Sequence, residues 1–283
     1  MFILVQSRLT RMDIPDRKNL RGANFIRANF QGADFEQADL RGANLEGANL
    51  QEANLQEANL RGANFEKANL KSAKLHLANF QEVNLQGANL QGADLYGANF
   101  QEANLQGVDF SGSDLQETNF QGANLQEAKL GGAKLEGAYF IEVHLQRANL
   151  QGVNFKKVNF QGADLREANL QSVELSGADL QEVDFEGANL QGANLQGANL
   201  QGAELYGADL QGANFQGADL EMAHLKLTNL EQANFQGANL KRAHHLTIDQ
   251  LSKLKTLYDT KLDDELLKKM KEKYPVLFEK PDR

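Results

Sequence analysis

The sequence predicts an all-β solenoid in which the chain turns a corner once in every repeat of five. Leu or Phe occupies every fifth position from Leu20 to Leu240, which makes 45 positions without an exception. Asn or Asp precedes that residue at 37 of the 45 positions, and a small residue stands one place earlier from Ala23 to Ala238. No insertion or deletion interrupts this register, so a single repeating architecture extends over the whole segment.

A period of five excludes the two ordinary ways of using a hydrophobic repeat. Five residues advance an α-helix by about 140° past a full turn, which would spread the Leu and Phe side chains around the helix. Five is also odd, so successive Leu and Phe residues would alternate between the faces of a long strand. A chain that turns after every repeat avoids both conflicts.

Each repeat assigns its residues to the inside or the outside of the coil. Residues two apart in extended backbone point the same way, so the small residue and the Leu or Phe face inward while Asn faces outward. The next two residues, often Gln-Gly or Gln-Glu, make the turn. Four such corners close a square, so four successive repeats make one coil.

The repeat resembles that of the pentapeptide repeat family, whose pattern is A(N/D)LXX. The stretch Gln191-Gly192-Ala193-Asn194-Leu195 has this pattern in its simplest form, and the resemblance covers residues 18–243. It implies a right-handed quadrilateral β-helix of about eleven coils. Phe80, Phe100, Phe120, Phe140 and Phe160 then share one position of the four-repeat coil, so we expect their rings to stack inside it.

The chain divides into three predicted segments: an N-terminal cap at 1–19, the pentapeptide-repeat β-helix at 20–243 and a short helical C-terminal cap at 244–283. Open solenoid ends expose unpaired strand edges, so both ends need a cover. Residues 1–19 leave the register, because Pro15 stands where Leu or Phe would be. An end cap is the simplest role for both segments, and a dimer or partner contact is the alternative for the C-terminal one.

Two helices are predicted in the C-terminal segment. Thr247 and Gln250 have the spacing of a capping box, and Leu251, Leu254, Leu257 and Tyr258 follow at helical spacing. A second helix is expected to begin after Asp263 and to end before Pro275. The stretch from Thr256 to Pro275 resembles the tails of cyanobacterial pentapeptide repeat proteins.

Composition removes most catalytic chemistries from consideration. The chain has no Cys, which excludes disulfides, thiolate metal sites and thiol nucleophiles. His144 and His224 share a coil position but are separated by about four coils, His244 and His245 are read as a surface pair, and carboxylates stacked at Glu82 and Glu102 are read as solubility charges. The sequence therefore predicts no enzyme, no catalytic, cofactor-binding or metal-binding residue, and no cofactor.

Charge gives the one functional indication. The net charge is −9, and residues 20–240 hold 28 acidic and 14 basic side chains, which argues against direct nucleic-acid binding. Some pentapeptide repeat proteins are DNA mimics that bind DNA gyrase. Here the acidic charge is sparser than that of duplex DNA and is spread over all faces, and Arg21, Arg41 and Arg61 form a basic column.

We therefore expect a non-enzymatic interaction scaffold whose rigid surface binds another protein, with a DNA mimic acting on DNA gyrase or topoisomerase as the alternative. No apolar run approaches the roughly 18 residues that a membrane span needs, and no signal peptide is apparent. The expected location is the cytoplasm. The expected state is a monomer, or a dimer through an end cap, and the partner protein is not identified by the sequence.

Overall fold

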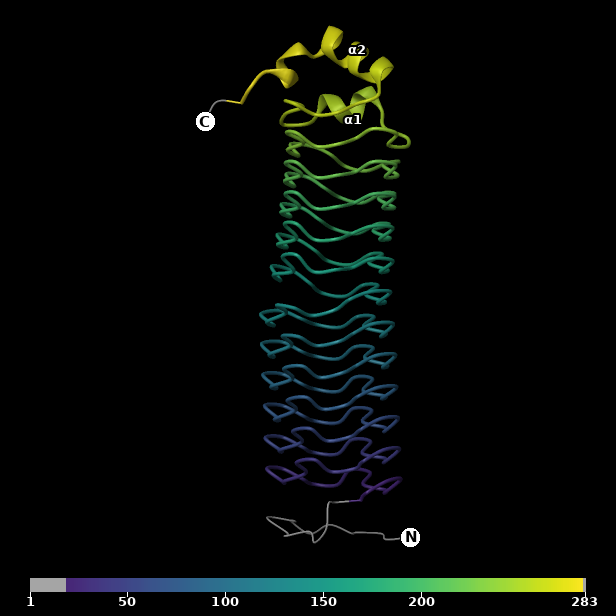
Figure 1. The fold of residues 1–283 in the computed structure, drawn as a ribbon, viewed down its shortest axis with the longest axis vertical. Coiled ribbons are helices and arrows are strands. Elements are labelled where there is room, and N and C mark those ends of the chain that lie inside the picture. Colours follow the sequence, from purple (N-terminus) through teal and green to yellow (C-terminus); the bar gives the residue numbers. More distant parts are fainter. Residues whose placement is uncertain (1–18, 282–283) are drawn as a thin grey trace. The chain divides into compact units, whose positions relative to one another are not determined.

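The structure, a computed structural model, describes residues 19–281 and divides into two compact units, one ending at His144 and the other beginning at Leu145. Each unit has the predicted right-handed quadrilateral β-helix fold (Figure 1). Short parallel bridges join residues that are four repeats apart, such as Asn44 with Asn64 in the first unit and Asn194 with Asn214 in the second. The predicted coil of four repeats is therefore confirmed within each unit.

The turn explains why Asn recurs at the outward position. The N–H of Ala193 donates to the carbonyl of Leu190 at 3.0 Å, which closes a turn around Gln191 and Gly192. The side-chain oxygen of Asn189 accepts a second bond, from the N–H of Gln191 at 3.1 Å. The Asn side chain thus satisfies a turn amide that would otherwise have no partner in the chain.

The second turn residue is left-handed in every repeat. Its φ is positive at every fifth residue from 22 to 242, whether that residue is Gly192 at 63° or a side-chain-bearing residue such as Glu182 at 55°. Glycine adopts this conformation without steric strain. Its frequency at this position follows, but the fold also accepts Glu, Lys, Arg and Gln there.

Backbone hydrogen bonds join each coil to the next. The N–H of Leu195 donates to the carbonyl of Asn214 at 2.8 Å, and the N–H of Asn194 donates to the carbonyl of Val173 at 2.9 Å. The same pattern recurs along each unit. These bonds join the facing edges of neighbouring coils, so the backbone is satisfied without long strands.

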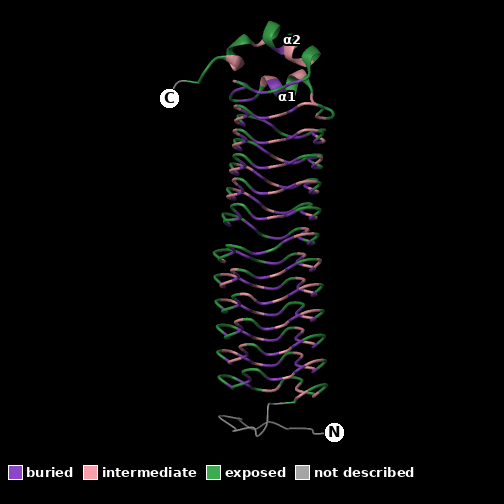
Figure 2. Ribbon diagram, viewed as in Figure 1, coloured by how far each residue is buried: buried purple, intermediate pink, exposed green. Residues whose placement is uncertain are grey.

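The core is formed by the two inward positions of each repeat. Ala193 and Leu195 are fully buried, and the buried residues alternate with exposed turns in both units (Figure 2). The predicted Phe stack is confirmed in the first unit, where the ring centroids of Phe80, Phe100, Phe120 and Phe140 follow one another at 4.6, 5.4 and 4.9 Å. Phe160 belongs to the second unit.

Three small inward positions carry a hydroxyl group instead of a methyl group. The side chains of Ser113, Thr118 and Thr228 are buried, and each donates to a backbone carbonyl of the preceding coil at 2.7–3.1 Å. A buried hydroxyl without a partner would be destabilising. The core therefore accepts these substitutions because the carbonyl one coil away lies within reach.

Two α-helices and a short 3-10 helix form the C-terminal end of the second unit. Helix α1 spans Ile248–Ser252, α2 spans Asp264–Lys273 and η1 spans Pro275–Phe278. The predicted capping box is confirmed, because Thr247 and Gln250 exchange backbone and side-chain hydrogen bonds. The side chain of Gln250 also donates to the carbonyls of Leu225 and Thr228, which ties α1 to the preceding coil.

One helix prediction is wrong. The spacing of apolar residues predicts that the first helix continues to Leu257 and Tyr258, but α1 ends at Ser252. Residues 255–262 instead return to the β-helix, where Thr256 bridges to Asn234 and Lys261 bridges to Asn239.

The physical reason is that residues 255–262 keep the five-residue spacing of buried leucines, although they lack the Asn and Gly of the regular repeat. Leu257 and Leu262 are five apart and buried, and the N–H of Thr260 donates to the carbonyl of Leu257 at 3.1 Å, as in the other turns. The hydroxyl of Thr260 donates to the carbonyl of Phe235 at 2.7 Å. Pairing with the exposed edge of the last regular coil outweighs the helical spacing of the leucines.

The predicted N-terminal cap lies outside the described residues except for Asn19, which bridges to Asp39.

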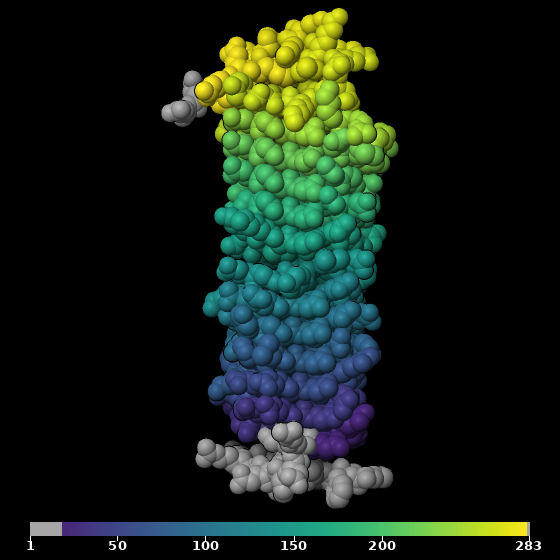
Figure 3. Space-filling view, viewed as in Figure 1, coloured from purple at the N-terminus to yellow at the C-terminus, as the bar shows by residue number. Residues whose placement is uncertain are grey.

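Residues 19–281 contain no helix with the length and apolar character needed to cross a membrane. In the space-filling view of Figure 3, the side chains follow the coils closely within each unit.

Candidate protein-interaction face

An asparagine ladder covers one outward position of the first unit, shared by residues 44, 64, 84 and 104 and called here the fourth coil position. The amide nitrogens of Asn64, Asn84 and Asn104 each donate to the side-chain oxygen of the Asn one coil earlier, at 3.2, 3.0 and 3.0 Å. Each oxygen also accepts from a turn N–H, as that of Asn84 does from Gln86. These amides therefore use their donors and acceptors on each other and leave a neutral surface.

The second unit has other side chains at the fourth coil position. The residues there are Asp164, Asp184, Glu204, His224 and His244. A carboxylate has no hydrogen to donate, so an amide ladder cannot continue through it.

The neighbouring outward positions also depart from the repeat pattern. We call this surface the charged face and define it by the outward residues of four successive coils: Glu182, Asp184, Glu186, Gly202, Glu204, Tyr206, Met222, His224, Lys226, Arg242 and His244. Val183 and Phe185 between the first three are fully buried, which fixes the outward direction of their neighbours.

One arginine partly neutralises the carboxylates at one end of this coil position. Arg166 lies 2.6 Å from Asp164 and 3.5 Å from Asp184. Burial opposes ionisation of Asp164, but hydrogen bonds from Arg166 and Gln146 outweigh burial, so the pKa of its carboxyl lies below the ordinary value. Asp164 and Asp184 therefore share one cation.

Three histidines gather at the other end. Nδ1 of His224 lies 3.4 Å from a carboxylate oxygen of Glu204, and its ring centroid lies 4.4 Å from that of His244 and 6.2 Å from that of His245. The pair His244–His245 was expected, and His224 was not expected beside it. Its spacing of one whole coil from His244 is the signal that predicts the contact.

Within residues 19–281, no three His, Cys, Asp or Glu side chains are arranged so that they could hold a metal ion. His144, the other histidine at this coil position, belongs to the first unit.

Apolar groups lie among the charges. Tyr206 is 41% exposed, and the ammonium nitrogen of Lys226 lies 5.9 Å from its ring centroid. Leu227, at the turn beside Lys226, is 69% exposed. Tyrosine side chains are enriched at surfaces that contact other proteins.

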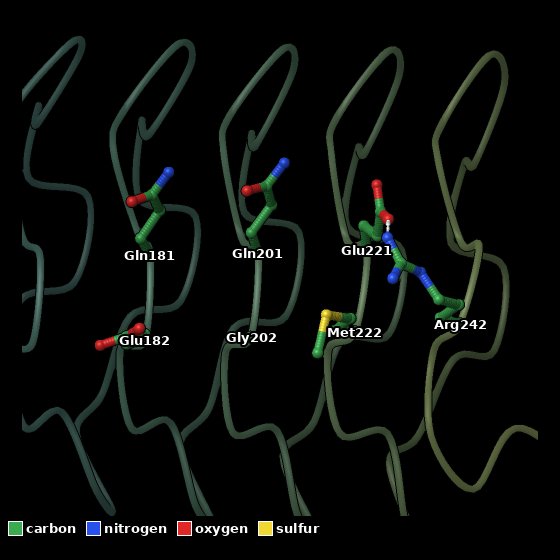
Figure 4. A pocket seen from close by; sticks show the side chains of 7 residues that line it. All are labelled: Gln181, Glu182, Gln201, Gly202, Glu221, Met222 and Arg242. Atoms are coloured by element: carbon green, nitrogen blue, oxygen red, sulfur yellow. Dashed lines mark hydrogen bonds and ion pairs between the residues drawn. The ribbon is translucent and has the colours of Figure 1, made fainter.

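A shallow groove of about 460 Å³ runs across the turns at one edge of the charged face (Figure 4). It is lined by Gln181, Glu182, Gln201, Gly202, Glu221, Met222 and Arg242. Arg242 reaches toward the preceding coil and forms an ion pair with Glu221. The groove is open to solvent and is not an enclosed chamber.

The sequence-predicted basic column of the first unit is paired with carboxylates. Arg41 donates two bonds to Asp39, at 2.8 and 2.5 Å, and Arg61 lies 2.6 Å from Glu82. Glu82 thus has a basic partner, which agrees with an ordinary surface charge. The column does not form a free basic patch.

Comparison with known proteins agrees with the repeat. The family model described as pentapeptide repeats matches in eight copies, some of them overlapping, between residues 16 and 244. No curated protein matches the chain.

Several solved structures are similar to the chain. HetL, a pentapeptide repeat protein involved in heterocyst differentiation regulation from the cyanobacterium Nostoc sp. strain PCC 7120, is 30% identical, with 77% of this chain and 91% of HetL covered and a TM-score of 0.36. Full-length QnrB1, a plasmid-mediated fluoroquinolone resistance protein, is 19% identical, with 69% and 98% covered and a TM-score of 0.46. Rfr23 from the cyanobacterium Cyanothece 51142 is 25% identical, with 50% and 86% covered and a TM-score of 0.21. By its repeat, its fold and the extent of the family match, the chain belongs to the pentapeptide repeat protein family.

Proposed function

We propose that the chain is a non-enzymatic binding protein and that its charged face is the surface that contacts another protein. The observation that carries this proposal is the replacement of the asparagine ladder by Asp184, Glu204 and His224 on successive coils of one unit. The expected setting is the cytoplasm, and the expected partner is a protein.

The residues of the charged face contribute little to the fold. The side chains of Glu204 and His224 are 48% and 41% exposed, and the fourth coil position is already joined by backbone bonds, such as that from Leu205 to His224 at 2.9 Å. An exposed ion pair adds about 0–1 kcal/mol. Because Asn at these positions would give a ladder, the departure from Asn points to a role other than stability.

The open surface supports binding rather than catalysis. Catalysis requires convergent groups in a pocket that excludes water. The groove at Gly202 is shallow and open, and its carboxylate Glu221 is already paired with Arg242. A contact surface needs no such enclosure.

The alternative, a DNA mimic acting on DNA gyrase, is favoured less. Residues 161–240 hold 12 acidic and two basic side chains, which is the strongest argument for it. Duplex DNA carries about one charge per 1.7 Å of its axis, however, and that array is regular. On the charged face Lys226 and Arg242 interrupt the negative charge, and Tyr206 and Met222 add apolar contact that a phosphate array lacks.

The test is to restore the repeat pattern on the charged face. The double variant Glu204→Asn with Tyr206→Gln gives this coil the ordinary outward residues and is expected to keep its melting temperature. The matched control, Glu174→Asn with Ser176→Gln, makes similar changes at another face of the same unit. The wild type, the double variant and the control are each cross-linked, as full chains, in a lysate of the source organism. The amount of each captured protein is then compared between the three experiments.

The proposal predicts that at least one specific partner is captured by the wild type and the control but is reduced at least tenfold with the double variant. Equal capture by all three proteins would contradict the proposal. Inhibition of gyrase supercoiling by the wild type, weakened by added salt, would instead support the DNA mimic.

A further inference from the structure

Resting on the proposed function, we propose that the groove at Gly202 receives an arginine side chain of the partner protein. The groove exists because one side chain is missing from a row of turns. Glu182, Gly202 and Met222 occupy the same turn position on successive coils, and Figure 4 places the bare turn of Gly202 between the other two. A Cβ atom at Gly202 would lie 3.7 Å from Cγ of Glu182, so a side chain there would occupy the groove.

Away from Arg242, the groove presents hydrogen-bond acceptors that have no donor. The exposed carboxylate of Glu182 has no hydrogen-bond or ion-pair partner within residues 19–281, and the same holds for the side-chain amide of Gln181. The amide nitrogen of Gln201 donates to Asp219 at 2.8 Å, which leaves its oxygen for another donor. A guanidinium group carries five N–H donors and no acceptor, so it matches this lining.

The two ends of the groove differ in charge. Arg242 is paired with Glu221, and the other oxygen of Glu221 accepts from Asn239 at 3.3 Å. Glu182 is therefore the lining residue whose charge is left uncompensated among the described residues. A cation is attracted to the Glu182 end and repelled from the Arg242 end.

Apolar surface completes the match. Met222 is 47% exposed, and its thioether lies on the side of the bare turn at Gly202. The methylene groups of an arginine side chain pack on such a surface while the charged end reaches a carboxylate. An acidic or purely apolar side chain would leave either Glu182 or the acceptor amides without a partner.

The experiment selects peptides from a displayed random library against the full chain and measures binding by fluorescence anisotropy. The groove is filled by Gly202→Gln, which the turn tolerates because Gln232 adopts the same left-handed conformation at φ 58°. The matched control is Gly212→Gln, at another turn of the same unit, where φ is 66° and no atom lies within 4 Å of the added Cβ. Glu182→Gln removes the charge without changing the shape.

The proposal predicts that the selected peptides share an arginine. Gly202→Gln and Glu182→Gln are each expected to weaken binding at least tenfold, and Gly212→Gln is expected to change it less than twofold. In the peptide, replacing the arginine by citrulline is expected to abolish binding, and replacing it by lysine to weaken it.

Two other outcomes separate this proposal from the proposed function. Peptides that lose binding with Glu204→Asn and Tyr206→Gln but bind normally to Gly202→Gln and Glu182→Gln would overturn the groove assignment and leave the charged face standing. Peptides indifferent to all of these changes would contradict both. Selected peptides without a shared arginine would also overturn the groove assignment.

Discussion

The two units share a core and differ on their surface. Leu95 in the first unit and Leu195 in the second are both fully buried at the same position of the repeat. At the fourth coil position, however, the first unit continues an asparagine ladder through Asn84, whereas the second places Glu204 and His224 there. The inward residues and the turns therefore carry the information for the fold, and the outward residues can change without altering it.

The backbone explains how the second unit holds together without an asparagine ladder at the fourth coil position. Asp184 still accepts from the N–H of Glu186 at 2.9 Å, so a carboxylate replaces Asn at the turn. The coils remain joined by backbone bonds such as the one from Asp184 to Ala163 at 3.0 Å. At the fourth coil position, the ladder is thus an addition to the fold rather than a requirement of it.

The largest expected effect would show that the two cores are equivalent. Leu95→Lys and Leu195→Lys each place a charge in a packed interior without a partner, so each is expected to destabilise its unit by more than about 4 kcal/mol. Thermal unfolding followed by circular dichroism measures the loss. A melting temperature unchanged by either substitution would contradict the inward assignment in that unit.

An intermediate effect would show that the outward positions are not equivalent. Asn84→Ala removes two ladder bonds and one turn bond, so it is expected to lower the free energy of unfolding by about 1–2 kcal/mol. Glu204→Ala removes only an exposed contact with His224 and is expected to change the free energy of unfolding by less than about 0.5 kcal/mol. Urea denaturation of both variants tests the contrast, and equal losses would refute it.

The smallest expected effect is on the loss of folding stability at low pH. The pKa of Asp164 is lower in the folded chain than in the unfolded chain, so its ionisation stabilises the fold above the unfolded value of about 3.9, and this stability is lost as the pH falls through the folded pKa. Asp164→Asn should therefore lose less stability than the wild type between pH 5 and pH 2.5, by up to about 1 kcal/mol.

Arg166→Gln serves as the control for the acid experiment. It removes one of the two side chains that lower the pKa of Asp164 and should reduce the same acid-dependent difference. If the wild type and both variants lose stability in parallel as the pH falls, the ion pair between Arg166 and Asp164 does not contribute to the acid sensitivity.

The period of five was sufficient to predict the coil of four repeats, the inward side chains and the Phe stack from Phe80 to Phe140. Thr247 and Gln250 likewise predicted the start of α1, because a capping box is a local signal. The return of Leu257 to the β-helix was missed, since the same leucines fit a helix and the deciding pairing with Asn234 is not local.

The candidate site was less accessible to sequence reasoning. The contact between His224 and His244 becomes visible only when the chain is aligned in rows of one coil each. The groove depends on the absence of a side chain at Gly202 between two longer ones, and most glycines of the repeat look alike in the sequence. Its free carboxylate, Glu182, could be identified only once the partners of Glu221 and Arg242 were known.

The left-handed turn has a consequence for tracing the ancestry of such proteins. The second residue of each turn keeps φ between 54° and 74°, whatever its side chain. Selection on the turn therefore favours glycine at this position without requiring it. Two inward positions in each five are held by the fold alone, and Asn is favoured at one outward position because it accepts a turn N–H. Pairs of family members therefore retain considerable identity after their partners have diverged, and common descent of function is better judged from the outward residues than from the percentage of identical positions.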